Sequence, residues 1–122
     1  MRKQYMPQEI EVWYIIPSIR KELAKAMAAK GLKQRKIAAL LGITEAAISQ
    51  YLKHKRAKEV DFMQETIEEI KKSSDRIEEN SELLIEEMQR ILSLVKKSRT
   101  LCLVHSKFSK LPEKCEACLE IG

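Results

Sequence analysis

The chain has 122 residues and a formal net charge of +5, with only three glycines, three prolines and few aromatic residues. Scarce turn-forming and aromatic residues favour helices over sheets, and the length suits one small domain or a domain with an appendage. No apolar run approaches the roughly 20 residues of a membrane span, and no signal core follows the basic start, so a cytoplasmic protein without membrane contact is expected.

The positive charge is concentrated near the N-terminus. Residues 1–60 contain 13 Lys and Arg against 5 Asp and Glu, whereas residues 61–99 contain 7 against 10 and residues 100–122 contain 3 against 3. A concentrated basic field is typical of a protein with a polyanionic partner, but it also occurs where charge only keeps a surface solvated. The motifs have to decide between these two interpretations.

The first part of the chain, residues 1–58, is predicted to form short helices separated by turns. Pro17 is tolerated in a first helical turn but disruptive further in, so it is expected near a helix start. Apolar residues at helical spacing run from Ile19 to Met27, and Gly31 is a natural helix C-cap.

Two more short helices are predicted between Gln34 and Lys53. Gly42 suits a turn that needs a positive φ, and Thr44 is a good N-cap for the second helix. Apolar residues at Ile37, Leu41, Ile43 and Ile48 supply the buried faces of this pair of helices. Gln34, Ala38, Gly42 and Ile48 resemble, in type and spacing, the pattern of repressor-type helix-turn-helix domains.

The outward face of the second helix carries short or amide side chains that allow close approach to base edges. Gln50 suits an adenine edge, Ser49 either base type, and Ala46 a thymine methyl group. Cations on both sides of this face are expected to meet phosphates. A helical hairpin that never touches DNA is the alternative. The predicted DNA contacts are Lys33, Gln34, Arg35, Thr44, Glu45, Ala46, Ser49, Gln50, Lys53, Lys55 and Arg56.

The second part, residues 59–99, is predicted to be one long charged helix with a break near 79–81. Its apolar seam follows a heptad register through Met63, Ile67, Ile70, Ser74, Ile77, Ser81, Leu84, Met88, Ile91 and Val95. So narrow a seam needs a partner, which is either the same helix of a second subunit or its own second half folded back. Dimerisation is the preferred interpretation, because two recognition helices then meet adjacent major-groove turns.

The third part, residues 100–122, contains all three cysteines. Two residues separate Cys102 from His105, and two separate Cys115 from Cys118, so the four side chains could hold one metal ion from two sides. Three thiolates and one imidazole suit tetrahedral zinc, and three thiolates also suit an iron–sulfur cluster. The glycines that usually complete a zinc knuckle are missing. A reversible thiol switch and cysteines without a special role are the alternatives.

The layout of the chain resembles that of small predicted archaeal helix-turn-helix regulators, some of which end in two Cys-x-x-Cys pairs. The resemblance implies a transcription regulator with a metal or iron–sulfur site at its C-terminal end. His105 stands where a cysteine would complete the first pair, which leaves zinc and a three-cysteine cluster equally open.

The sequence thus predicts an all-α protein with a helix-turn-helix domain, a dimerisation helix and a Cys-bearing tail. Its expected function is that of a homodimeric regulator that binds specific double-stranded DNA and senses metal or redox state. The alternative is a helical interaction adaptor or antitoxin-like module without specific DNA readout. No enzyme is expected, because no third orienting group accompanies the Cys and His residues.

Overall fold

The computed structural model describes residues 5–53 and 60–108. All regular elements within these ranges are helical, so the predicted all-α fold is confirmed. The elements, in chain order, are α1 (Pro7–Ile10), a π-turn η1 (Glu11–Ile15), α2 (Ile16–Ala29), α3 (Gln34–Leu41), α4 (Glu45–Leu52), α5 (Gln64–Glu79), a 3-10 turn η2 (Ser81–Leu83), α6 (Leu84–Lys97) and α7 (Thr100–Phe108). None of the described helices is both long and apolar enough to cross a bilayer.

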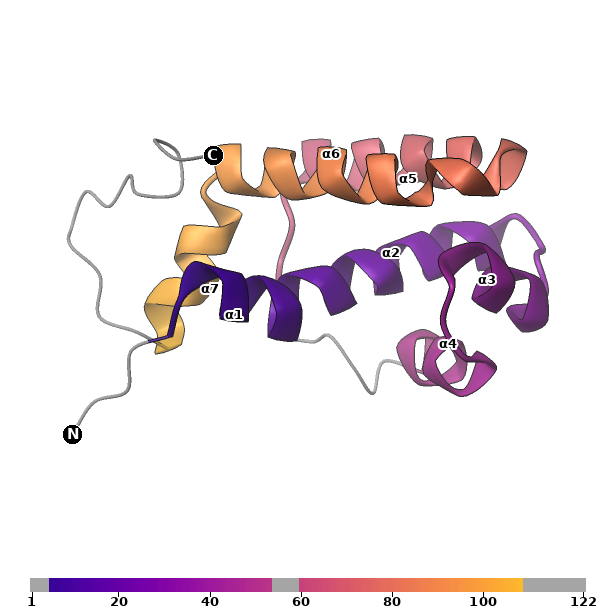
Figure 1. The fold of residues 1–122 in the computed structure, drawn as a ribbon, viewed down its shortest axis with the longest axis horizontal. Coiled ribbons are helices and arrows are strands. Elements are labelled where there is room, and N and C mark those ends of the chain that lie inside the picture. The colour runs from indigo at the N-terminus through magenta and orange to yellow at the C-terminus, as the bar shows by residue number, and fades with distance from the viewer. Residues whose placement is uncertain (1–4, 54–59, 109–122) are drawn as a thin grey trace.

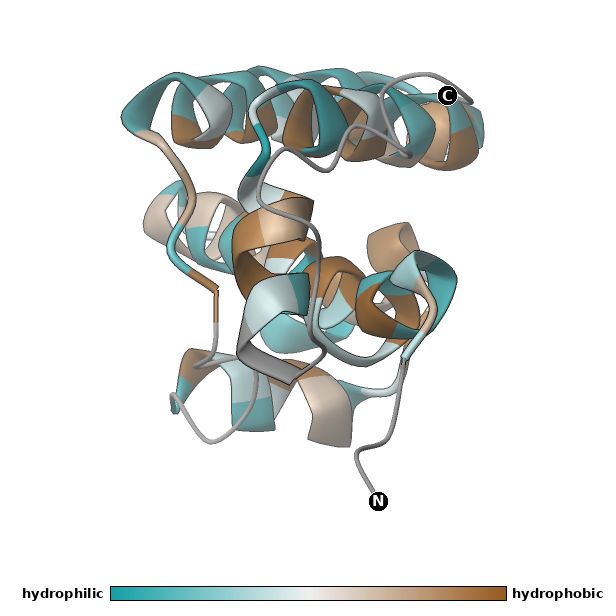
Figure 2. Ribbon diagram, turned by 90° about the vertical axis from the view of Figure 1, so that its left-hand side faces the viewer, coloured by the Kyte–Doolittle hydropathy of each residue, from teal (hydrophilic) through white to brown (hydrophobic). Residues whose placement is uncertain are grey.

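The helices form two layers that share one hydrophobic core. The α5–α6 hairpin is the upper layer of Figure 1, and α2 runs beneath it, with α3 and α4 at one end and α7 at the other. Figure 2 shows hydrophilic residues on the outer side of the hairpin and apolar residues between it and the layer below. Buried residues from Ile10 in α1 to Val104 in α7 belong to the same cluster, so the three predicted parts pack together.

Pro17 lies in the first turn of α2, so the expected helix start near this residue is confirmed. Helical backbone continues from α1 through η1 into α2, and the amide of Ile16 donates to the carbonyl of Glu11, five residues earlier. Proline has no N–H and its ring crowds the carbonyl four residues before it, here that of Trp13. A π-turn is wider than an α-helical turn, so it can accommodate the missing N–H and the proline ring without ending the helix. α2 therefore starts beside Pro17, but the π-turn joins it to α1 without a gap in the helical backbone.

The predicted break in the long helix is confirmed at Asn80. Asn80 has extended backbone dihedral angles, and its side chain accepts a hydrogen bond from the amide of Glu82 at 3.1 Å. The chain turns back there, so α5 and α6 lie antiparallel (Figure 1). Ile70, Ile77 and Ile91 of the seam are buried within one chain. Two partners were considered for the seam: a second subunit and the second half of the same helix folded back. The structure contains the second of these.

A buried carboxylate ties the two helices of the hairpin together. One oxygen of Glu87 accepts from Ser73 Oγ at 2.7 Å, from Arg76 at 3.2 Å and from Arg90 at 3.3 Å. Arg90 also donates to Glu69 at 2.7 Å. Burial raises the pKa of Glu87, but hydrogen bonds from Ser73 and Arg76 and the charge of Arg90 outweigh it, so this pKa is lowered from its ordinary value. The ionised form of Glu87 thus stabilises the hairpin.

Lys30 joins the hairpin to the end of α2. Its ammonium group donates to Ser74 Oγ at 3.0 Å and pairs with the carboxylates of Asp75 and Glu78. Burial lowers the pKa of Lys30, whereas hydrogen bonds to Asp75 and Glu78 raise it, and the net shift is upward. Because α2 also packs against α4, these contacts fix the hairpin relative to the helices that carry the predicted DNA-binding face.

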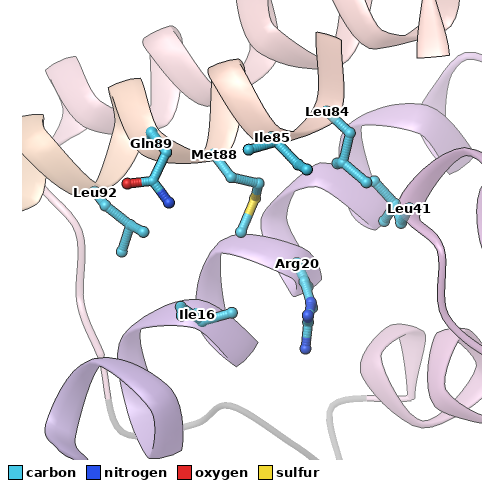
Figure 3. Close-up of a pocket in the computed structure, with 8 residues that line it drawn as sticks. All are labelled: Ile16, Arg20, Leu41, Leu84, Ile85, Met88, Gln89 and Leu92. Atoms are coloured by element: carbon cyan, nitrogen blue, oxygen red, sulfur yellow. The ribbon is translucent and has the colours of Figure 1, made fainter. Parts of the chain in front are cut away.

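An apolar groove remains between α2 and α6 on one flank of the molecule (Figure 3). It has a volume of about 210 Å3. Its walls are formed by Ile16, Arg20, Leu41, Leu84, Ile85, Met88, Gln89 and Leu92. Leu84 also packs near the turn at Gly42, so the groove borders the junction of α3 and α4.

Candidate nucleic-acid interface

The junction of α3 and α4 has the geometry that the sequence predicted. α3 ends at Leu41, and Gly42 follows in the left-handed region with φ of 65°. The hydroxyl oxygen of Thr44 then caps α4 by accepting a hydrogen bond from the amide of Ala47 at 3.1 Å. Both roles rest on local chemistry: glycine enters the left-handed region without a Cβ penalty, and threonine satisfies an otherwise unpaired helix amide.

Replacing Gly42 by alanine is expected to lower the free energy of unfolding by about 1–2 kcal/mol, because an L-residue pays that cost in the left-handed region. The new Cβ would lie 3.9 Å from Leu84 Cδ2, an ordinary contact, so the loss should come from the backbone alone. Urea denaturation measures it. Gly42→Asn is the matched control and should lose less, since asparagine tolerates this conformation. Equal losses for the two variants would contradict the backbone explanation.

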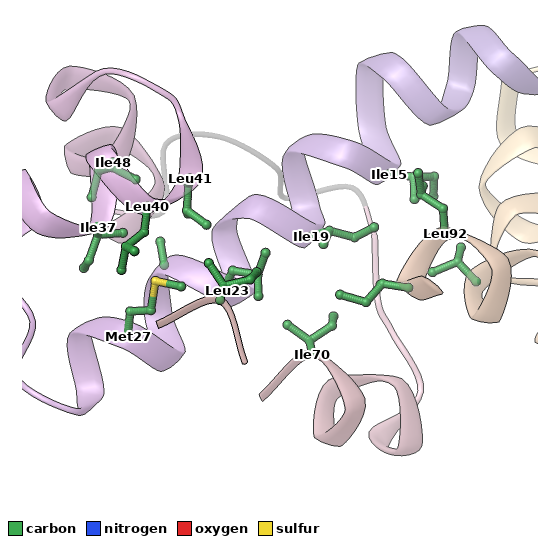
Figure 4. Close-up of a cluster of buried hydrophobic side chains, with 14 of the residues drawn as sticks. Ile15, Ile19, Leu23, Met27, Ile37, Leu40, Leu41, Ile48, Ile70 and Leu92 are labelled. Atoms are coloured by element: carbon green, nitrogen blue, oxygen red, sulfur yellow. The ribbon is translucent and has the colours of Figure 1, made fainter. Parts of the chain in front are cut away.

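The inner faces of α3 and α4 are buried against α2. Figure 4 shows Ile37, Leu40 and Leu41 of α3 and Ile48 of α4 gathered on the side of Met27 in α2. Ile37, Ile48 and Met27 are fully buried. Their burial fixes which side of α4 faces outward, because residues about two positions from Ile48 point away from the core.

The outward side of α4 is accessible to a partner. Among the predicted contacts that the structure describes, only Ser49 is half-buried. The exposed ones are Lys33, Gln34, Arg35, Thr44, Glu45, Ala46, Gln50 and Lys53. Lys55 and Arg56 lie outside the described residues. The structure thus brings the base-reading candidates together on one short helix, with three of the predicted cations near the starts and ends of α3 and α4.

The two ends of the molecule differ in their balance of charge. α4 lies on the far side of α2 from the α5–α6 hairpin (Figure 1). Exposed cations surround α3 and α4, whereas residues 61–99, which include the hairpin, contain 10 Asp and Glu against 7 Lys and Arg. The exposed carboxylates of the hairpin include Glu65, Glu68, Glu79, Glu82 and Glu86, and its exposed cations are Lys71, Lys72, Arg76 and Lys97. Such a separation orients a protein in the field of a polyanion, with its basic end forward.

Two of the four predicted metal ligands lie on α7. Cys102 is half-buried, and His105 is buried, with Nε2 against the carbonyl oxygen of Tyr5. Because a carbonyl oxygen only accepts, this contact requires a proton on Nε2, and the neutral tautomer that fits it has its lone pair on Nδ1. Cys115 and Cys118 lie outside the described residues. No cluster of three or more His, Cys, Asp or Glu side chains suited to a metal occurs in the part of the chain that the structure describes.

The sequence interpretation did not identify the groove between α2 and α6. Its residues come from helices far apart in the chain, and only their packing brings them together. One signal was present: Ile85 is a large apolar residue beside the seam residue Leu84, where a heptad pattern expects a polar flank. An apolar residue outside the seam indicates a second buried or binding face.

Comparisons of the chain with models of protein families, with curated proteins and with solved structures found no match. The assignment of a function therefore depends on the surface chemistry and geometry of the chain itself.

Proposed function

We propose that this protein is a sequence-specific DNA-binding transcription regulator that acts by binding and not by catalysis. The main support for this proposal is the outward face of α4, which presents short and amide side chains to solvent. The opposite face of the same helix is buried in the core. A major groove admits an α-helix, and side chains such as those of Ala46, Ser49 and Gln50 fit base edges. The cations of α3 and Lys53 would contact the flanking phosphates.

The charge distribution supports this assignment over a helical adaptor. An adaptor that binds proteins through its hairpin has no need of a basic end, whereas a DNA-binding protein gains both affinity and orientation from one. In the proposed complex, α4 enters the major groove and the acidic hairpin faces away from the duplex. A homodimer would place two copies of α4 in adjacent turns of the groove.

Selection from a pool of random duplexes, followed by fluorescence anisotropy, tests the assignment. We expect one enriched sequence that binds more tightly than its scrambled version, with affinity that falls steeply as salt rises, because bound phosphates release counterions. Equal binding of all duplexes, or binding that is insensitive to salt, would contradict the regulator and favour the adaptor.

Gln50→Ala should weaken binding to the selected duplex by about 1–3 kcal/mol and relax the base preference at one position. Lys53→Ala is the matched comparison on the same helix and should weaken selected and scrambled duplexes alike, with a smaller salt slope. Anisotropy titrations on both duplexes separate the two effects. Identical behaviour of the two variants would show that α4 does not read bases as proposed.

We also propose that Cys102, His105, Cys115 and Cys118 form a zinc or iron–sulfur site that gives the regulator its metal or redox response. Cys102 and His105 are three residues apart on α7 and therefore share a face of that helix. With Nε2 directed at Tyr5, Nδ1 of His105 would be the ligating atom. Cys115→Ser with Cys118→Ser should abolish metal bound after anaerobic purification, measured by elemental analysis and the visible spectrum. Unchanged metal content would exclude these ligands.

A further inference from the structure

The surface around α3 and α4 contains one carboxylate among several cations. Glu45 is the only acidic residue within residues 31–53, whereas the same segment contains four cations, Lys33, Arg35, Lys36 and Lys53. Glu45 is exposed in the first turn of α4, and it forms no ion pair within residues 5–53 and 60–108. An unpaired carboxylate in this position opposes the approach of any duplex, because phosphates carry charge of the same sign.

Glu45 lies at one edge of the face that α4 turns outward. Ala46 and Gln50 are four residues apart and lie in the middle of that face, opposite the buried Ile48. Glu45 and Ser49 share the adjoining edge, where Ser49 is half-buried. Residues rise about 1.5 Å each along a helix, and base pairs are stacked about 3.4 Å apart. Side chains from Glu45 to Gln50 therefore span about two base-pair steps of a major groove.

We propose that Glu45 accepts a hydrogen bond from a cytosine in the major groove and thereby selects duplexes with cytosine at this position. This inference rests on the proposed function and names part of the sequence that the regulator binds. A carboxylate only accepts hydrogen bonds. Cytosine presents only a donor in the major groove, its N4 amino group, whereas guanine presents two acceptors, thymine an acceptor and a methyl group, and adenine a donor beside an acceptor. An acceptor-only side chain is thus best matched by cytosine.

The negative charge of Glu45 also disfavours the wrong duplexes. Cations such as Lys33 and Lys53 attract every duplex alike, because phosphates carry no sequence information. The carboxylate is repelled by the phosphates of every duplex and gives up contact with water on binding, and the amino group of a cytosine replaces part of that lost hydrogen bonding. Without the cytosine, the charge is left with repulsion alone. A repulsive group of this kind produces specificity by weakening the wrong complexes.

A role confined to the helix itself is the alternative explanation for Glu45. A carboxylate in the first turn stabilises a helix through the helix dipole. In that case, removal of Glu45 would affect binding to all duplexes alike. Glu65 is the matched control, because it is also an exposed glutamate in the first turn of a helix, but on α5 in the hairpin, across α2 from α4 (Figure 1).

Selection from random duplexes with the natural chain and with Glu45→Ala, followed by anisotropy titrations, tests the proposal. We expect the natural chain to enrich a cytosine within about two base pairs of the adenine assigned to Gln50, and the variant to lose this preference. The variant's affinity for the selected duplex should fall about 5- to 150-fold. Its affinity for a scrambled duplex should rise about two- to fivefold at low salt, because a repulsive charge is gone. Glu65→Ala should keep the cytosine and change both affinities by the same small factor.

Glu45→Gln gives a second, independent readout. Glutamine has nearly the same size but no charge, and its amide binds adenine through N6 and N7. The enriched base at this position should therefore change from cytosine to adenine. Circular dichroism should show unchanged helix content in both Glu45 variants, since the side chain is exposed.

Failure of this inference and failure of the proposed function can be told apart. If Glu45→Ala still prefers cytosine, or if its affinities for selected and scrambled duplexes change equally, the role of Glu45 is refuted while the regulator stands. If the natural chain enriches no duplex at all, the proposed function is refuted, and the role of Glu45 with it.

Discussion

Replacing Ile77 by alanine is expected to lower the free energy of unfolding by about 2–5 kcal/mol, the usual cost of removing three carbons from a well-packed core. Ile77 is fully buried in the core that α5 shares with α2 and α6. A chain of this size has a total stability of about 5–15 kcal/mol, so the variant should be folded but markedly weakened. Urea denaturation at neutral pH measures the change.

Ile85→Ala is the matched control for this prediction. It removes the same atoms from the same hairpin, but at a side chain that is 74 % exposed, so its loss of unfolding free energy should stay within about 0.5 kcal/mol. Similar losses at Ile77 and Ile85 would contradict the fold-back of α6 on α5.

Glu87→Ala is expected to lower the free energy of unfolding by about 2–4 kcal/mol, somewhat below the cost of breaking a fully buried ion pair, since Arg76 and Arg90 partly reach water. The substitution leaves the buried hydroxyl of Ser73 without its acceptor and removes the anion shared by the two arginines. Glu86→Ala is the control on the adjacent, exposed position and should change stability little. A small decrease in the free energy of unfolding of Glu87→Ala would show that the network contributes little to the stability of the hairpin.

The same network predicts a loss of stability in acid. Because the pKa of Glu87 is lowered in the folded chain, folding favours the ionised form. Its contribution is fully present above the unfolded glutamate pKa of about 4.3 and is lost as pH falls through the lower, folded value. The pKa of Glu69 is lowered too, by hydrogen bonds from Lys72 and Arg90, and acts in the same direction. Denaturation series below pH 5 should show a shallower pH dependence for Glu87→Gln than for the natural chain.

Local chemistry made several features predictable from the sequence. The left-handed backbone at Gly42, the cap at Thr44 and the break near Asn80 each depend on one residue and its immediate neighbours. Pro17 shows the limit of such reasoning. Its place near a helix start was predictable, but the π-turn that joins α2 to α1 was not. Ile15 before the proline and Ile19 after it are buried in the same core, which many residues distant in the sequence complete.

By itself, the sequence determined the helical class, the position of the turn before α4 and the amphipathic seam, because periodicity, caps and glycine act over a few residues. Only the tertiary structure decided that the seam closes on its own second half, that Glu87 is buried among arginines and that Ile85 is left exposed beside a groove. Those outcomes depend on which helices pack together across dozens of residues, and a heptad pattern is equally satisfied by a second subunit or by the same chain.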